Sequence, residues 1–131
     1  MENKKLLVID DAEPNLLLFD SMFENDGRVE VLLRENGVGI VDYCLDKMPD
    51  LILLDLMMPE IHGFDVLKML KANPKLTKIP VVIISALEGP EEIKKGIELG
   101  ALDYLIKPVD YEENYIMVLK LLELDYPPMD Y

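Results

Sequence analysis

Four short, mainly apolar runs are each followed by a side chain that could take part in metal or phosphoryl chemistry. The runs and the residues after them are 6–9 with Asp10 and Asp11, 51–54 with Asp55, 81–84 with Ser85, and 102–106 with Lys107. If these runs are parallel strands, their carboxyl ends meet at one edge of the sheet, which is where open α/β sheets bind ligands. The pattern therefore predicts a site for a divalent cation and a phosphoryl group, with an aspartate placed as the nucleophile.

Three carboxylates in one cleft repel each other, and without compensation at least one is expected to take up a proton. A hard cation such as Mg²⁺ removes the repulsion, because it takes oxygen ligands and commonly bridges carboxylates and phosphates. A carboxylate beside such a cation can attack phosphorus and form an aspartyl phosphate. Lys107 is a compact positive charge that suits the other side of the phosphoryl group, and Ser85 can donate a hydrogen bond to it.

Each of these residues also has an ordinary structural interpretation. Acids between a strand and a helix often cap the helix, a serine after a strand often lies in a turn, and a single lysine before proline is usually solvated. Chance placement of all four at the strand ends of one sheet is rare, so the combination favours a functional site. By contrast, we expect His62 to be a surface residue in a turn and Cys44 to be a buried small hydrophobe.

The runs also define the architecture, because strand-length apolar runs that alternate with helical segments are typical of βαβ units around a parallel sheet. We expect strands at about 5–9, 29–33, 51–54, 81–84 and 101–106, each followed by a helix. The second is the least apolar, which predicts an edge strand, and the third is apolar on both faces, as at a covered sheet centre. The expected inward-facing residues are Leu17, Leu18, Met22 and Phe23 in the first helix, Val41, Cys44, Leu45 and Met48 in the second, and Tyr115, Ile116, Leu119 and Leu122 in the last.

Length, charge and cysteine content restrict the function further. The 131 residues fit one domain, expected over 4–124, and the tail 125–131 is either the natural end or the start of a linker. The net charge of -13 repels nucleic-acid phosphates and anionic membranes, so we expect no direct binding to either. The one cysteine fits a reducing compartment, and the N-terminal apolar stretch is too short for a secretion signal or a membrane span. We therefore expect a cytoplasmic protein.

Taken together, the residues resemble a response-regulator receiver domain of the chemotaxis type, which is the phospho-accepting module of two-component signalling. The resemblance covers about 4–124 and rests on four motifs, which are 6–11, 49–59, Ser85-Ala86 and 100–108. It implies a flavodoxin-like, doubly wound α/β fold with a five-stranded parallel sheet of order 2-1-3-4-5 and helices on both faces.

The resemblance also implies roles for the acidic residues. Asp55 matches the phosphoacceptor of the family. Asp11 and Asp55 match the direct Mg²⁺ ligands, and the backbone carbonyl of Met57 completes the protein side of that site. Asp10 matches the remaining acidic residue, which usually acts on the metal through water.

Further roles are implied for the phosphate-binding and switch residues. Ser85, the Ala86 amide and Lys107 match the groups that contact the phosphoryl oxygens, and Lys107 is followed by Pro108 through a bond that is often cis in the family. Tyr104 matches the aromatic switch residue, which turns inward as Ser85 moves toward the phosphoryl group.

Three positions depart from the commonest form of the family. His62 stands where aspartate is frequent, which affects no catalytic role. Met57, two residues after Asp55, and Leu87, two residues after Ser85, are variable positions in the family. Because apolar side chains at both give little polar help to an attacking water, we predict slow self-dephosphorylation.

The resulting hypothesis is a signalling switch rather than a metabolic enzyme. It takes a phosphoryl group from a histidine kinase or a histidine phosphotransfer protein onto Asp55, and it promotes its own Mg²⁺-dependent phosphorylation and dephosphorylation. The downstream effector would bind the face of the fourth helix, fifth strand and fifth helix, through which such domains can also form homodimers.

Three other hypotheses are weaker. A receiver-like interaction module that is never phosphorylated would be expected to lack one of the charged site residues. A flavodoxin-like FMN protein would need a hydroxyl- and glycine-rich loop after the first strand, where 10–14 is acidic instead. A metal-dependent phosphatase with an aspartyl nucleophile usually has a second aspartate two residues later, where Met57 stands.

Overall fold

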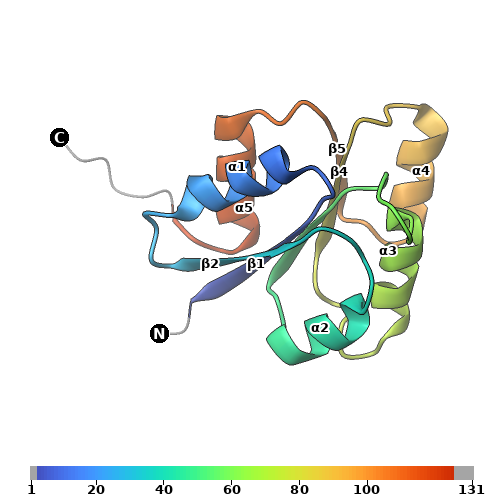
Figure 1. Cartoon of the computed structure of the whole chain (residues 1–131), viewed down its shortest axis with the longest axis horizontal. Helices are drawn as coiled ribbons and strands as arrows, with labels where there is room; N and C mark the ends of the chain where they lie inside the picture. The colour runs from blue at the N-terminus through green and yellow to red at the C-terminus, as the bar shows by residue number, and fades with distance from the viewer. Residues whose placement is uncertain (1–2, 126–131) are drawn as a thin grey trace.

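The computed structural model describes residues 3–125, in which strands and helices alternate along the chain (Figure 1). The strands are β1 (Lys4–Ile9), β2 (Val29–Arg34), β3 (Leu51–Leu54), β4 (Val81–Ser85) and β5 (Asp103–Ile106). The helices are α1 (Glu13–Phe23), α2 (Ile40–Lys47), α3 (Gly63–Ala72), α4 (Pro90–Glu98) and α5 (Tyr111–Leu121). The predicted alternation of strands and helices is confirmed, with shifts of one to three residues at some of the ends.

The strands form one parallel sheet of order β2-β1-β3-β4-β5, which confirms the predicted flavodoxin-like α/β fold. As predicted, β2 lies at an edge and β3 at the centre, where all of its side chains are buried. The register pairs Ile9 with Leu54, and Ser85 with Ile106. The strand ends that precede or carry the predicted site residues are therefore direct neighbours.

Apolar cores cover both faces of the sheet. Because successive side chains of a strand point to opposite faces, Leu6 and Val8 pack with Phe19 of α1, whereas Leu7 and Ile9 pack into the other core. Figure 1 shows α1 and α5 on one side of the sheet and α2, α3 and α4 on the other. Since both faces are occupied by apolar packing, the carboxyl edge of the sheet is left as the place where polar groups gather.

The inner face of α1 differs from the prediction in part, since Met22 and Phe23 are buried as expected. Leu17 is 55% exposed, and Leu16 and Phe19 are buried in its place. The apolar run 16–19 has no polar gap that marks which side faces the sheet. The direction in which the helix leaves β1 decides which of its sides faces the sheet. The sequence pattern does not specify this direction.

Two further inward-facing positions were predicted wrongly. Met48 lies after the end of α2, where its backbone is left-handed with φ 48°, and its side chain is 46% exposed. In α5, Ile116 is 42% exposed and Val118 is buried, while Leu119 and Leu122 are buried as predicted. Cys44 is a buried free thiol, as expected, and burial raises its pKa to about 11.

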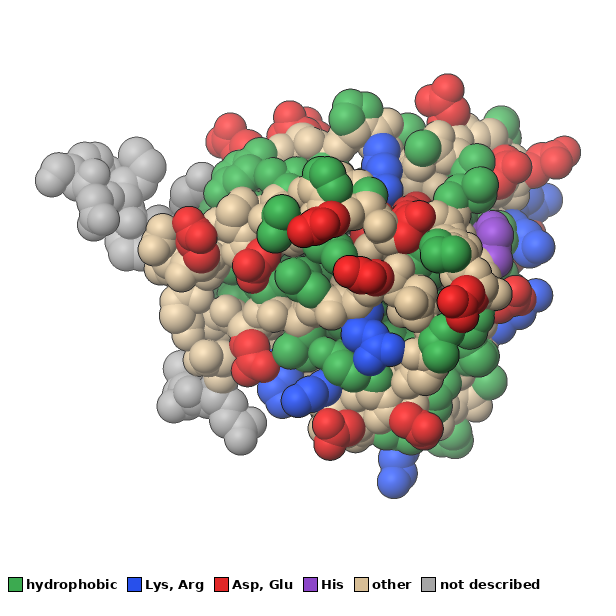
Figure 2. Space-filling model, in the orientation of Figure 1, with side chains coloured by type: hydrophobic (Ala, Val, Ile, Leu, Met, Phe, Trp, Pro, Cys, Tyr) green, Lys and Arg blue, Asp and Glu red, His purple; other side chains and the backbone are tan. Residues whose placement is uncertain are grey.

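The surface carries the excess negative charge of the sequence. Acidic side chains are spread over the face seen in Figure 2, whereas Lys and Arg occur there in small separate groups. Such a surface favours cationic ligands and basic partners. None of the helices within residues 3–125 has the length and apolar character that crossing a membrane requires.

Gly63 lets the first turn of α3 approach the chain segment that carries Asp55. Its backbone N–H donates to the carbonyl oxygen of Leu56 at 2.9 Å. A Cβ atom at position 63 would overlap the carbonyl oxygen of Asp55 and lie 2.6 Å from the Cα of Leu56. Because both contacts are with backbone atoms, neither can be relieved by a change of side-chain rotamer.

We therefore expect Gly63→Ala to lower the free energy of unfolding by about 1–3 kcal/mol, the usual cost of overpacking. Gly27→Ala is the matched control, because a Cβ there meets nothing within 4 Å. The control should stay within about 1 kcal/mol of the wild type. Urea unfolding of the three proteins measures the difference, and equal effects of the two substitutions would contradict the close approach.

Candidate functional site

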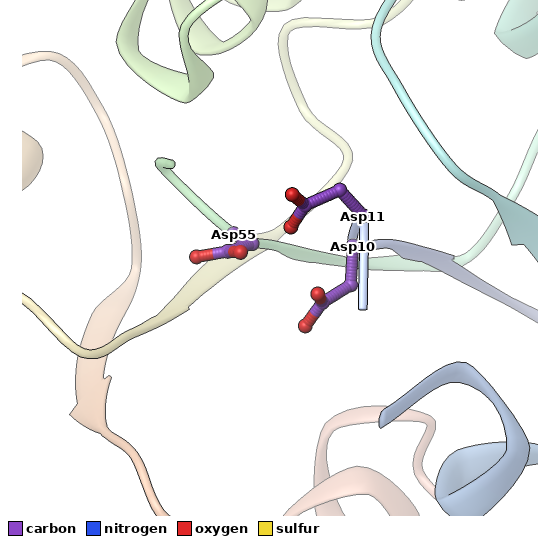
Figure 3. A group of neighbouring side chains, drawn as sticks. All are labelled: Asp10, Asp11 and Asp55. Atoms are coloured by element: carbon purple, nitrogen blue, oxygen red, sulfur yellow. The ribbon is translucent and has the colours of Figure 1, made fainter. Parts of the chain in front are cut away.

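The three predicted aspartates meet at the carboxyl ends of two neighbouring strands. Asp10 and Asp11 follow β1, and Asp55 follows β3, so their side chains project from adjacent strand ends (Figure 3). The backbone N–H of Asp55 donates to the carbonyl oxygen of Ile9 at 2.9 Å, which extends the β1–β3 pairing to the site itself. The parallel register therefore fixes the separation of the carboxylates.

The carboxylates form an oxygen-rich cluster. One oxygen from each of Asp10, Asp11 and Asp55 lies within 4.8 Å of the other two. Asp10 and Asp55 are 4% and 5% exposed, whereas Asp11 lies at the surface. An all-oxygen donor set is typical of sites for hard divalent cations. The residues present therefore fit a divalent metal, with Asp11 on the side open to solvent.

Lys107 joins this cluster from the end of β5. Its Nζ lies 3.0 Å from Oδ2 of Asp10 and 3.3 Å from Oδ2 of Asp55. Its backbone N–H donates to the carbonyl oxygen of Ser85 at 2.9 Å, so the chain stays paired with β4 up to the lysine. The following Lys107–Pro108 peptide bond is cis, as predicted. The structure thus brings the lysine to the two buried carboxylates.

Burial and charge shift the pKa values of these groups in ways that reflect their packing. The pKa of Asp55 is raised, first because burial penalises the carboxylate and then because Asp10 carries a like charge, and Lys107 only partly offsets this. Burial acts to lower the pKa of Lys107, but Asp10 and Asp55 together outweigh it and raise that pKa. The lysine therefore stays charged, and the ionised form of Asp55 carries a net electrostatic cost.

Asp10 is held by further contacts that the sequence did not reveal. Its Oδ1 accepts from the backbone N–H of Ala12 at 2.9 Å, and its Oδ2 accepts from Nδ2 of Asn15 at 3.2 Å. Asp10 therefore does not cap α1, whose N-cap is Ala12 without a side-chain cap, but it holds the turn before the helix and belongs to the acidic cluster. Asn15 also belongs to the site, because its side chain donates to Asp10. The sequence signal that could have indicated this is an amide residue about one helical turn after the two acids.

Ser85 and Tyr104 lie beside the cluster and share one loop residue. Ser85 is fully buried, and its Oγ accepts from the backbone N–H of Leu87 at 3.2 Å. The hydroxyl of Tyr104 donates to the carbonyl oxygen of Leu87 at 2.5 Å, and this side chain is 8% exposed. Burial raises the pKa of Tyr104, whereas the neighbouring Ser85 acts in the opposite direction. Both side chains therefore face inward and hold the loop after β4.

A comparison with protein-family models matches residues 6–118 to the response regulator receiver domain. The chain belongs to this family. It is a phospho-accepting domain of two-component phosphorelay signalling. The acidic cluster and Lys107 stand at the strand ends where the sequence motifs placed them.

Individual relatives and structures agree with this assignment. The response regulator PleD of Caulobacter vibrioides is 40% identical over 106 residues, which are 81% of this chain and 23% of PleD. The chain therefore spans less than a quarter of that relative. Sporulation initiation phosphotransferase F of Bacillus subtilis is 33% identical over 124 residues, covering 95% of this chain and 98% of that protein. The structure of the Mn²⁺-bound response regulator Rcp1 superimposes with a TM-score of 0.78 at 24% identity, over 98% of this chain and 99% of that one.

His62 has a structural role in this receiver domain that the sequence analysis did not predict. It is half-buried rather than a surface residue, and its Nδ1 accepts from the backbone N–H of Phe64 at 3.0 Å. It therefore caps α3, and its ring packs against Phe64 with centroids 5.1 Å apart. Met57, which is 57% exposed, lines a pocket of about 500 Å³ together with His62 and Asp11.

The raised pKa of Asp55 has a consequence for stability. A carboxyl whose pKa is higher in the folded state lowers stability as pH rises through its titration, and the cost is complete above the folded pKa. We therefore expect Asp55→Asn to be more stable than the wild type near pH 7 without divalent metal, by on the order of 1 kcal/mol. This difference in stability should shrink when the pH approaches the ordinary pKa range of carboxyl groups. Saturating Mg²⁺ should reverse the difference by stabilising only the wild type.

Urea unfolding near pH 7 and near pH 5, with EDTA or with Mg²⁺, measures these differences. Asp46→Asn, at an exposed position of α2, is the matched control and should behave as the wild type in all conditions. A variant that is less stable than the wild type near pH 7 in EDTA would show that Lys107 overcompensates the burial of Asp55.

Proposed function

We propose that Asp55 accepts the phosphoryl group from a phosphohistidine of a histidine kinase or phosphotransfer protein. An Oδ atom of Asp55 attacks phosphorus, the O–P bond forms as the P–N bond breaks, and the imidazole leaves with the electron pair. The observation that carries the proposal is the position of Lys107 Nζ, 3.3 Å from Oδ2 of Asp55 in a cluster of three carboxylates. The lysine can follow the negative charge as it moves from the carboxylate to the phosphoryl oxygens.

The cation that we propose for the cluster is Mg²⁺, with Asp11, Asp55 and the backbone carbonyl of Met57 as its direct ligands. When bound, it would neutralise charge that develops on the phosphoryl oxygens. The oxygens of Asp10 already accept from Ala12, Asn15 and Lys107, which supports a role for Asp10 through water. The relative Rcp1 has been solved with Mn²⁺, another hard divalent ion, which supports a cation of this class.

Ser85, the Ala86 amide and Lys107 are the proposed phosphoryl contacts. The Oγ of Ser85 accepts a hydrogen bond from Leu87, so its own proton is left for donation. Donation to a phosphoryl oxygen would draw Ser85 toward the site and thereby change its contact with the loop. Because the Tyr104 hydroxyl bonds to the same Leu87, this loop is the proposed connection between Asp55 and the switch residue.

We further propose the face of α4, β5 and α5 as the surface that phosphorylation changes. Along α4 only Gly96 is buried, and a Cβ there would lie 2.7 Å from Cδ1 of Ile83 and 3.2 Å from Cδ2 of Tyr104. A helix with so little buried surface can move at low cost, and it touches the switch residue. Activation would then be a shift between two populations. The same face is available for a downstream effector or a homodimer.

The unit that carries this function is proposed to be 4–124. Of the tail 125–131, only Asp125 belongs to the described residues, and the interpretation of 126–131 as a natural end or a linker lies outside them. The buried free thiol of Cys44 suits a reducing compartment, which supports the cytoplasm as the proposed location.

The decisive experiment is intact mass after incubation with Mg²⁺ and acetyl phosphate. We expect one added phosphoryl group on the wild type, none without Mg²⁺, and none on Asp55→Asn. Lys107→Ala should bind Mg²⁺ but form the adduct far more slowly, because the mobile positive charge is lost. A folded wild type that binds Mg²⁺ yet gains no phosphoryl group from acetyl phosphate or a histidine kinase would instead favour an interaction module that works unphosphorylated.

The phosphorylated protein should lose its phosphoryl group slowly. Met57 is exposed beside the site and Leu87 is half-buried, and neither side chain can orient an attacking water. Met57→Asn should speed the loss several-fold by adding a polar group that positions water, whereas Met57→Leu should not. The decay of the mass adduct after removal of the phosphodonor measures both. Rapid decay of the wild type, or equal rates for the two variants, would contradict the role given to these positions.

A further inference from the structure

Met57 is the most exposed methionine in the described part of the chain, and it lies at the edge of the acidic cluster. Its side chain is 57% exposed, whereas those of Met48 and Met69 are 46% and 37% exposed. Met57 lines a pocket of about 500 Å³ together with Asp11, which belongs to the cluster. A thioether is therefore open to solvent in the same pocket wall as one carboxylate of the site.

The backbone between β3 and α3 holds Met57 at this position. The N–H of Met58 donates to the carbonyl oxygen of Leu56 at 3.1 Å, which closes a three-residue turn around Met57. Leu56 is fully buried, and Met58 packs against the apolar core on one face of the sheet. Both neighbours of Met57 are thus anchored in the protein. Because the turn begins directly after Asp55, it keeps the exposed thioether close to that residue.

Oxidation of this protein by peroxide is expected at thioethers rather than at the thiol. Cys44 is the one cysteine of the sequence, it is fully buried, and burial raises its pKa to about 11. Little of the reactive thiolate is therefore present near neutral pH. A thioether needs no deprotonation to react, so its exposure decides how readily it is oxidised. On that criterion Met57 ranks first among the described methionines.

We propose that Met57 is a redox-sensitive site, and that its oxidation by hydrogen peroxide shortens the lifetime of the phosphoryl group on Asp55. A lone pair of the Met57 sulfur attacks one peroxide oxygen, and the S–O bond forms as the O–O bond breaks. The departing hydroxide takes the proton of the transferred oxygen and leaves as water. The sulfur is oxidised by two electrons to the sulfoxide, which methionine sulfoxide reductases can return to the thioether.

Oxidation changes the property of Met57 that matters for hydrolysis of the aspartyl phosphate. A thioether sulfur is only a weak hydrogen-bond acceptor, so it does not hold a water molecule in place. The sulfoxide carries a polar oxygen on the same flexible side chain. A water that donates one O–H to this oxygen keeps a lone pair for attack on phosphorus. This inference rests on the proposed phosphorylation of Asp55, and it gives oxidised Met57 the effect expected of Met57→Asn.

The pocket has space for the added oxygen and for the attacking water. Its remaining lining residues are Met58, Pro59 and His62, and its volume is about 500 Å³. A water molecule takes up only about 30 Å³ in the liquid. Oxidation of Met57 can therefore change the polarity of the pocket while the turn around Met57 stays in place.

The test compares the decay of the phosphoryl adduct before and after oxidation. The unphosphorylated protein is treated with hydrogen peroxide, catalase removes the excess, and peptide mass analysis measures the oxygen added at each methionine. Mg²⁺ and acetyl phosphate then form the adduct, and intact mass follows its decay after the phosphodonor is removed. We expect oxygen on Met57 and a decay several-fold faster than in the untreated wild type. Both methionine sulfoxide reductases together, with a thiol reductant, should restore the slow decay.

Variants assign the effect to one methionine. The adduct of Met57→Leu should decay at the same rate with and without peroxide treatment, because the oxidisable sulfur beside the site is gone. Met48→Leu/Met69→Leu is the matched control, since it removes the other two strongly exposed thioethers of the described residues and keeps Met57. Peroxide should speed its decay as much as that of the wild type. Each variant is compared with its own untreated sample, so any effect of the substitution itself on the decay cancels.

Three results would overturn this inference and leave the proposed function intact. They are equal decay before and after oxidation of Met57 in the wild type, faster decay of peroxide-treated Met57→Leu, and oxidation of Met48 without oxidation of Met57. By contrast, an untreated wild type that gains no phosphoryl group from acetyl phosphate or a histidine kinase would contradict the proposed function, and this inference with it. The untreated sample therefore distinguishes the two failures.

Discussion

The contact of one ammonium group with two buried carboxylates is the interaction on which the site depends. Lys107 Nζ lies 3.0 Å from Asp10 and 3.3 Å from Asp55, both of which are almost fully buried. Removing charges from water is expensive, and a buried pair recovers this cost only when its geometry is good and its remaining atoms are bonded. The parallel sheet supplies that geometry, because three strands end at the same edge with backbone pairing up to the charged residues.

The same arrangement explains why function is located in the loops while stability is located in the sheet. The strands that support the site are covered on both faces by apolar side chains, which leaves them little freedom to move. The loop after β4 is instead held at Leu87, whose N–H donates to Ser85 and whose carbonyl oxygen accepts from Tyr104. Hydrogen bonds of this kind can be exchanged for others at small net cost. A rigid frame with exchangeable contacts at its edge is what a switch requires.

Much of the site and the fold could be predicted because the buried strands of a parallel sheet appear in the sequence as short apolar runs. Each apolar run ends where a charged or hydroxylic residue begins, and the structure confirms that these ends meet. The inner faces of the helices were predicted less well. For Leu17, an apolar run without polar gaps does not specify which side of the helix faces the sheet, and Met48 is exposed because it lies after the end of α2. His62 as a helix cap was missed because serine, threonine, aspartate and asparagine dominate such positions. The Asn15 contact with Asp10 depends on the angle at which α1 leaves the sheet.

The surroundings of Asp10 bear on how the site could accommodate a phosphoryl group. A phosphoryl group on Asp55 would compete with Asp10 for the ammonium of Lys107. Asp10 does not depend on that lysine alone, since it also accepts from the Ala12 N–H and from Asn15. These two donors still bond to the carboxylate when the lysine moves, so its oxygens keep hydrogen-bond partners. On this argument, Asn15 and the start of α1 allow Lys107 to change partners without leaving a bare charge behind. The contacts of Asp10 with Ala12 and Asn15 would therefore serve phosphoryl transfer as well as the fold.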